Sequence, residues 1–352
     1  MRRLSIATVV LLGTVVFGQR TEAQTLTFSL FERYLDAFRL ASGIPGMSAA
    51  ILQNGVIVWQ RGFGRRDVEG ALPATPDTPY LLGGLSQVFG ATVLLRKCVD
   101  QGSAELNDPV QLWIPHFPEP DTTLLQLLSH TVPGGGSYKY APERFAALTG
   151  VIEACTKVPY RALLAFEIFD RFVMADSAPD HLVATPTLQD VDWFDAPHLA
   201  HYAQVVGRLA TPYRVVGGRP QRNPTAQPRR ADAADGVISS VRDLARFDAI
   251  LTSEVLLAPA TRDLAWTQAF SGATPLPTGL GWFVQRYNGE PIVWQFGSIK
   301  GGHSSLVVKV PNRGLTLILL ANSDGLTAPF ALESGDVTTS LFATLFLRLF
   351  VR

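Results

Sequence analysis

The chain has 352 residues, of which 47% are hydrophobic and 17% charged, and its 30 basic and 30 acidic residues cancel to a formal net charge of zero. Single hydrophobic cores stop growing at roughly 250–300 residues, so we expect a large core divided between two lobes. The sequence has no basic block of the kind that binds nucleic acid and no acidic tail, and we predict no nucleic-acid partner, no metal and no cofactor.

The first 23 residues have the composition of a secretory signal peptide. Arg2 and Arg3 give a positive start, Leu4–Phe17 an apolar core and Thr21–Ala23 a small-residue cleavage site. The apolar run is shorter than the about 20 residues that a helix needs to cross a bilayer. We therefore predict cleavage after Ala23 and an exported protein, periplasmic or secreted, with no transmembrane span in the mature chain. A retained N-terminal anchor is the alternative.

Strand patterns gather at the two ends of the mature chain. Asn54-Gly55 and Asn288-Gly289 each separate two apolar, β-rich runs, and both residue types tolerate the positive φ of a tight hairpin turn. Short connections favour antiparallel neighbours, so these runs predict one antiparallel sheet built from both chain ends. The predicted hairpins join Ser48–Leu52 to Val56–Trp59, Trp282–Tyr287 to Ile292–Phe296, and Ser304–Val310 to Leu315–Leu320.

Helical patterns dominate the middle of the chain. Apolar residues recur at three-to-four spacing in five segments. The predicted helices are Ser86–Val99, Arg144–Cys155, Tyr160–Phe172, Ser240–Leu251 and a closing helix at Val337–Arg352. We therefore predict an α/β fold with a discontinuous sheet domain, residues 24–90 plus 270–352, flanked by helices and carrying an inserted, mainly helical lobe, residues 91–269.

The sequence contains two cysteines, Cys98 and Cys155. In an exported protein they could form one disulfide. Each lies on a predicted helix within an apolar pattern, so we favour two buried free thiols, because geometry rather than count decides whether a disulfide forms.

Six segments in a fixed order carry a family resemblance. They are Ile44–Met47, Gly62–Asp67, Thr75–Tyr80, Leu127–Thr131, Gly236–Phe247 and Gly279–Trp282. In this order they resemble the β-lactamase-related serine hydrolases, the family of class C β-lactamases, penicillin-binding proteins and related esterases. The resemblance runs from about Phe28 to the C-terminus. It implies a β-lactamase/transpeptidase-like fold with the active site in the cleft between the two lobes.

The first catalytic motif of that family is Ser-x-x-Lys at the start of a helix. A serine and a lysine three residues apart share one helical face, where the lysine can take the proton of the nucleophile. Here the resemblance places Gly84 at the serine and Gln87 at the lysine. Glycine has no side chain to attack with, and an amide is no base near neutral pH.

The second motif, Tyr-x-Asn, is reduced to Tyr140-Ala141-Pro142. Tyr140 is either a residual site residue or an amphipathic core tyrosine. Pro142 offers no side-chain donor and suits the start of the helix that follows. His130 belongs to a segment that the resemblance marks as structural.

The third motif normally carries Lys or His on a strand that lines the cleft. Here it reads Phe296-Gly297-Ser298, so the cation that would favour a substrate carboxylate is missing. Lys300 and His303 are the alternative sources of charge, from a shifted loop, although most loop charges are simply solvated.

Three hypotheses follow from these replacements. The first is an exported pseudoenzyme whose cleft binds a carboxylate or an acyl group of a small molecule or peptide, through backbone N–H groups of Gly84 and a residue near Ser298. The second is an active hydrolase of esters, amides or β-lactams that uses a substitute nucleophile, with Ser86 the first suspect. The third is a structural partner of an envelope assembly that uses its apolar C-terminal helix as a contact.

One further cluster has a metal-like composition. It consists of Asp190, Asp192, Asp195, His198 and His201. His-x-x-His can place two imidazoles on one helix face, but the pattern His-Glu-x-x-His is absent. We interpret the cluster as a solvated loop of the helical lobe.

Overall fold

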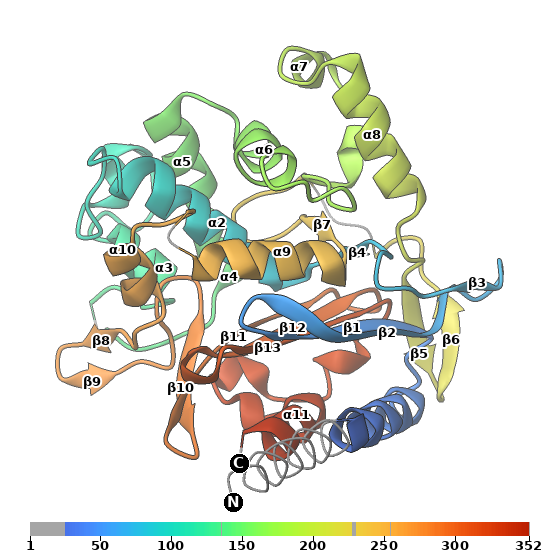
Figure 1. Ribbon diagram of the computed structural model, residues 1–352. Helices are drawn as coiled ribbons and strands as arrows, with labels where there is room; N and C mark the ends of the chain where they lie inside the picture. The colour runs from blue at the N-terminus through green and yellow to red at the C-terminus, as the bar shows by residue number, and fades with distance from the viewer. Residues whose placement is uncertain (1–24, 135, 227–229, 254, 352) are drawn as a thin grey trace, which may run out of the picture.

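The computed structural model describes residues 25–134, 136–226, 230–253 and 255–351, so the predicted signal peptide lies outside the described residues. A seven-stranded antiparallel sheet crosses the centre of the molecule in the order β10-β11-β12-β13-β1-β2-β3 (Figure 1). Its strands come from both chain ends, which confirms the predicted sheet. The strands are β1 (Gly46–Gln53), β2 (Val56–Asp67), β3 (Leu72–Pro73), β10 (Phe283–Tyr287), β11 (Glu290–Ser298), β12 (Ser304–Val310) and β13 (Leu315–Ala321).

The turn residues that predicted the three hairpins adopt the backbone conformations that these turns require. Asn54 and Gly55 have φ values of 51° and 76°, and Asn288 and Gly289 have 50° and 83°. The turn between β12 and β13 ends at Gly314, with φ 59°. Because positive φ is cheap for Asn and Gly and strained for most other residues, these positions define the hairpin registers.

Alternation along the strands divides the core into two layers. In β1, Met47, Ala49 and Ile51 face one side, where the helix of residues 25–41 and α11 (Leu341–Phe350) pack (Figure 1). The opposite face carries Ala50 and Leu52 and is covered by α2 (Gln87–Leu94) and α9 (Val241–Thr252). Both faces of the central strands β1, β12 and β13 are therefore buried, as strands with near-continuous apolar sequences require, whereas β2 and β3 at one edge of the sheet are mostly half-buried or exposed.

The C-terminal helix uses its apolar face inside its own fold. Phe342, Ala343, Phe346 and Leu347 of α11 are buried against the sheet. The predicted helix from residue 337 begins instead as a 3₁₀ turn at Val337–Thr339, and the α-helix starts after the N-cap Ser340. These four side chains are therefore not available to a partner, and the third hypothesis stays a prediction.

The segment between the sheet-forming ends is mainly helical, as predicted, but two predicted helices change type along their length. Helix α2 continues as a π-helical segment at Leu95–Val99. Helix α6 (Tyr160–Leu163) likewise continues as a π-helical segment at Leu164–Asp170. The predicted helix 144–155 is broken into α4 (Pro142–Phe145) and α5 (Leu148–Thr156). The division at residues 90 and 269 stays a prediction.

Among the described residues, this segment and its borders also contain four further α-helices and three small sheets. The helices are α3 (Leu124–Leu128), α7 (Leu188–Val191), α8 (Ala196–Gly207) and α10 (Pro259–Ala265). Three two-stranded sheets pair β4 (Tyr80–Leu81) with β7 (Ile238–Ser239), β5 (Tyr213–Val216) with β6 (Arg219–Arg222), and β8 (Phe270–Ser271) with β9 (Thr274–Pro275). Within the described ranges no helix combines the length and the apolar character needed to cross a membrane.

Cys98 and Cys155 form a disulfide, so our preference for two free thiols was wrong. Cys98 lies in the π-helical segment after α2 and Cys155 near the end of α5, with their Cα atoms 6.2 Å apart. Both cysteines do lie on helices in an apolar environment, as predicted. The sequence pattern could not show that these two helices pack side by side, and it is this packing that permits the bond.

Candidate functional site

The three motif regions converge where the 3₁₀ turn η1 (Gly83–Ser86), which precedes α2, packs against the end of β11. A Cβ built at Gly297 would lie 1.8 Å from the carbonyl oxygen of Leu82 and 2.8 Å from the amide nitrogen of Gly84. Only glycine allows the strand to approach the turn so closely. This contact places the peptide of Gly84 beside β11, where the family resemblance expects the reacting centre.

The space next to Gly84 is filled by Tyr140. A Cβ built at Gly84 would lie 2.7 Å from the Oη of Tyr140 and 3.1 Å from the carbonyl oxygen of Phe296. The tyrosine ring is held in place by aromatic neighbours, with centroids 5.4 Å from Phe296 and 5.8 Å from Phe283. The place of the nucleophile side chain is therefore occupied by a packed phenol.

Gln87, which the family resemblance places at the lysine, is completely buried, and its amide is hydrogen-bonded to three side chains. Its Nε2 donates to the Oη of Tyr140 at 3.2 Å, and its Oε1 lies 3.0 Å from Nε2 of His130. The Nε2 of Gln295 donates to the same Oε1 at 3.3 Å. Two segments far from Gln87 in the sequence, residues 130–140 and strand β11, thus meet at its neutral amide.

The tautomer of His130 follows from its neighbours. The backbone N–H of Ala141 donates to Nδ1 of His130 at 3.2 Å, so the ring proton resides on Nε2 and is donated to Gln87. Burial, together with the positive charge of Arg144, lowers the pKa of His130 to about 3. Burial also raises the pKa of Tyr140 well above its ordinary value. At neutral pH the histidine is a neutral donor toward Gln87 and the phenol stays protonated, so neither acts as a base toward position 84.

Ser86 points away from this centre. It is fully buried, and its Oγ accepts a hydrogen bond from the backbone N–H of Val237 at 3.2 Å. A nucleophile must reach solvent-borne substrate and a base. The burial of Ser86 argues against a substitute nucleophile at this residue, and the assignment stays a prediction.

The other predicted site residues have separate environments. Pro142 opens α4, the role that its ring favours. Lys300 is exposed in the loop between β11 and β12. His303 is fully buried, and burial lowers its pKa to about 3, so it is uncharged at neutral pH. His303 consequently does not replace the missing cation of the third motif.

Ser298 opens onto a pocket of about 330 Å³ between the end of β11 and the segment of residues 327–334. Thr327 ties the two walls together by donating from Oγ1 to the carbonyl oxygen of Gly297 at 3.4 Å. The lining is Phe296, Ser298, Thr327, Ala328, Phe330, Ala331, Glu333 and Ser334. Glu333 is the charged residue of this lining, so the pocket combines aromatic surface, hydroxyl groups and a carboxylate.

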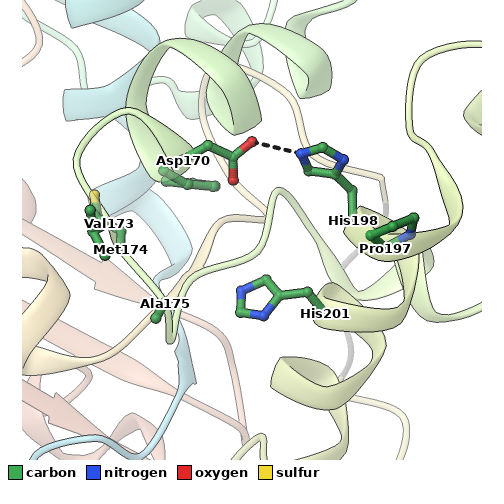
Figure 2. A pocket seen from close by; sticks show the side chains of 8 residues that line it. Asp170, Val173, Met174, Ala175, Pro197, His198 and His201 are labelled. Atoms are coloured by element: carbon green, nitrogen blue, oxygen red, sulfur yellow. Dashed lines mark ion pairs between the residues drawn. The ribbon is translucent and has the colours of Figure 1, made fainter.

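The metal-like cluster matches the predicted solvated loop only in part: Asp192 and Asp195 are exposed in the connection between α7 and α8, whereas Asp190, His198 and His201 lie on the helices. Asp190 is buried in α7 and ion-paired to Arg161, while Asp195 is the N-cap of α8 and accepts from the backbone N–H of His198 at 3.0 Å. His198 reaches Asp170 across a pocket of about 340 Å³, with His201 set apart from this pair (Figure 2). Among the described residues no group of three or more such side chains has the geometry of a metal site.

Sequence reasoning missed the contribution of two residues. His130 was interpreted as structural, yet it contacts Gln87 directly. Gln295 was not singled out, although a polar residue within the apolar run of β11 is a signal for a buried hydrogen-bond network. The structure thus adds both residues to the centre formed by Gly84, Gln87 and Tyr140.

The fold and the position of this centre define a protein of the β-lactamase/transpeptidase-like class. The profile of the Beta-lactamase family matches residues 29–335, and the chain belongs to that family. The structure of the D-alanine carboxypeptidase AmpC from Burkholderia cenocepacia superposes with a TM-score of 0.69 at 18% identity, covering 91% of this chain and 99% of that one.

Two curated relatives match over shorter stretches. The chain is 36% identical over 85 residues to the penicillin-binding protein PbpX of Bacillus subtilis (strain 168), covering 24% of this chain and 22% of the relative. It is 32% identical over 102 residues to a teichoic acid D-alanine hydrolase of Staphylococcus aureus, covering 29% of this chain and 25% of the relative. The matching segments thus span about a quarter of the length of these relatives.

Proposed function

We propose that this protein is an exported, non-catalytic member of the Beta-lactamase family that binds an acyl-containing ligand. The observation that carries the proposal is the buried Gln87, whose neutral amide takes the place of the lysine and is hydrogen-bonded on both sides. The packed Tyr140 beside Gly84 supports the same conclusion. Export rests on the sequence of residues 1–23 and is tested by the N-terminal sequence of the mature protein.

The pocket beside Ser298 is the proposed binding site. Its hydroxyl groups suit an acyl or amide group, while the carboxylate of Glu333 favours a ligand with an ammonium group over one with a carboxylate. The sequence analysis left open whether the ligand presents a carboxylate or an acyl group. Because the negative charge of Glu333 repels a carboxylate and attracts an ammonium group, an aminoacyl ligand fits the pocket better. The name of the teichoic acid D-alanine hydrolase points to a ligand of this chemistry, a D-alanyl group.

D-Alanyl-p-nitroanilide tests binding and cleavage in one experiment. We expect it to raise the melting temperature of the mature protein without release of nitroaniline. Glu333→Gln should remove most of the shift, whereas the exposed and distant Glu105→Gln should leave it unchanged. Nitroaniline release in proportion to protein concentration would overturn the non-catalytic part, and an unchanged melting temperature would overturn the binding part.

A further inference from the structure

A further pocket, of about 610 Å³, lies at the other end of the sheet from Gly84 and from the pocket beside Ser298. Its walls are the β1–β2 turn, the β12–β13 turn and the helices α9 and α10, and it includes Gln53, Lys309 and Trp266. In β12, Ser304 pairs with Ser298 beside the family site, and Lys309 follows five residues later, about 17 Å along the strand. The two pockets are therefore separate sites.

The floor of this pocket is a buried polar cluster. Lys309 is ion-paired to Asp248 and donates to Oγ1 of Thr252 at 3.3 Å. The hydroxyl of Thr316 donates to the other oxygen of Asp248 at 3.0 Å. Lys309, Asp248 and Thr316 are all almost fully buried. Buried, mutually bonded groups keep their positions, so the pocket presents a preformed polar floor.

One wall is aromatic. The half-buried indole of Trp266 has the Nζ of Lys309 at 5.0 Å from its ring centroid and the guanidinium of Arg262 at 5.7 Å. These cations lie within the usual range of cation–π contacts and fix the orientation of the ring. An aromatic ring beside polar groups of both signs suits a ligand with an apolar face and a polar edge.

The charges in this pocket are balanced. Lys309 pairs with Asp248, Arg262 with Asp263 at 2.8 Å, and Arg313 of the β12–β13 turn with Glu290 at 3.0 Å. An anionic ligand would compete with these carboxylates for the cations, and a cationic ligand would compete with the cations for the carboxylates. Hydroxyl groups both donate and accept, so a neutral polyhydroxyl ligand is compatible with every pair.

We propose that this pocket binds a neutral oligosaccharide. The apolar C–H face of a sugar ring packs on Trp266, while its hydroxyl groups bond to Arg262 and Asp263. They also donate to the amide oxygens of Gln53 and Asn312 at the two hairpin turns, whose amino groups already donate to the carbonyl oxygen of Arg313 and to Glu290. The volume is within the roughly 300–1,000 Å³ of ordinary small-molecule sites. The protein would then bind a glycan at one end of the sheet and the acyl-containing ligand in the pocket beside Ser298 at the other end.

Titration calorimetry with chitobiose, cellobiose and maltose tests this site. We expect at least one of the three to bind with a Kd below about 5 mM, and Trp266→Ala to weaken that binding about tenfold or more. Trp266→Phe, which keeps an aromatic face, should retain binding. Trp193→Ala, a partly exposed tryptophan of the helical lobe, is the matched control and should not alter the Kd.

If Trp266→Ala does not melt cooperatively, Asp263→Ala provides the second variant, because Asp263 is 65% exposed and its loss does not disturb the core. It should weaken binding about threefold or more by removing a hydroxyl partner. The proposal fails if none of the three sugars binds at up to about 20 mM. It also fails if the folded variants bind as the parent does, or if inorganic phosphate or glucuronate binds more tightly than the neutral sugars.

Discussion

Position 84 and the tyrosine next to it form one packing unit. The Oη of Tyr140 stands where the first side-chain atom of residue 84 would lie. Gly84→Ala should therefore lower the free energy of unfolding by about 1–3 kcal/mol, the usual cost of overpacking. In a Tyr140→Phe background, which lacks the oxygen, the same substitution should cost less. Urea unfolding of the four proteins measures this coupling, and additive costs would show that the two residues do not compete for space.

His303 makes a separate prediction about pH. Its folded-state pKa is lowered to about 3 by burial, and neither ring nitrogen has a hydrogen-bond partner within the described residues. Between about pH 6.5 and 3 the unfolded chain binds a proton that the folded chain excludes, so stability is present above pH 6.5 and is lost as the pH falls. The loss is about 1.4 kcal/mol per pH unit.

The variant His303→Leu isolates this contribution. Other buried groups, including Asp235 with its pKa raised to about 6, titrate in both proteins and cancel in the difference. We expect the stability of the variant, relative to the parent, to rise steadily as the pH is lowered from 6.5 toward 4. Parallel pH profiles from chemical unfolding would contradict a neutral, buried His303.

Among the elements, the helix that follows Gly84 is held by the disulfide between Cys98 and Cys155, which are 57 residues apart in sequence. Closing a loop of this length stabilises a folded chain by about 4 kcal/mol in the chain-entropy model. The double substitution of both cysteines by alanine should therefore lower the free energy of unfolding by about that amount in urea titrations. A parent protein that loses no stability in the presence of a reductant would show that the bond is not formed in solution.

At this scale the hairpins show where sequence reasoning works, and the disulfide shows where it fails. Asn54-Gly55 and Asn288-Gly289 encode their turns locally, because Asn and Gly adopt positive φ at little cost whatever surrounds them. The bond between Cys98 and Cys155 depends on how two helices pack, which no local pattern specifies. For the same reason the centre at Gln87 could be predicted only in part. Its partners His130 and Gln295 reach it through the tertiary fold, whereas the glutamine at the position that the family resemblance assigns to a lysine could be read from the sequence.

At the scale of the whole molecule, the hydrogen bonds around Gln87 predict that placing serine at residue 84 and lysine at residue 87 does not produce a catalyst. In the variant Gly84→Ser/Gln87→Lys, the new ammonium would face the N–H of His130 Nε2, a donor, within a buried site. The new serine would meet the Oη of Tyr140. We expect this double variant to be less stable than the parent and to hydrolyse nitrocefin no faster than the parent. Turnover at rates typical of an enzyme would show that the surrounding residues remain competent.

We propose that the protein folds as the serine hydrolases of its family do but forms no covalent acyl intermediate. Intact-mass analysis after incubation with a fluorophosphonate and, separately, with benzylpenicillin tests it most directly, with an active class C β-lactamase labelled in parallel. We predict an unchanged mass for this protein while it shows a cooperative melt. A stoichiometric adduct on any serine would contradict the claim, and peptide mapping would identify the nucleophile.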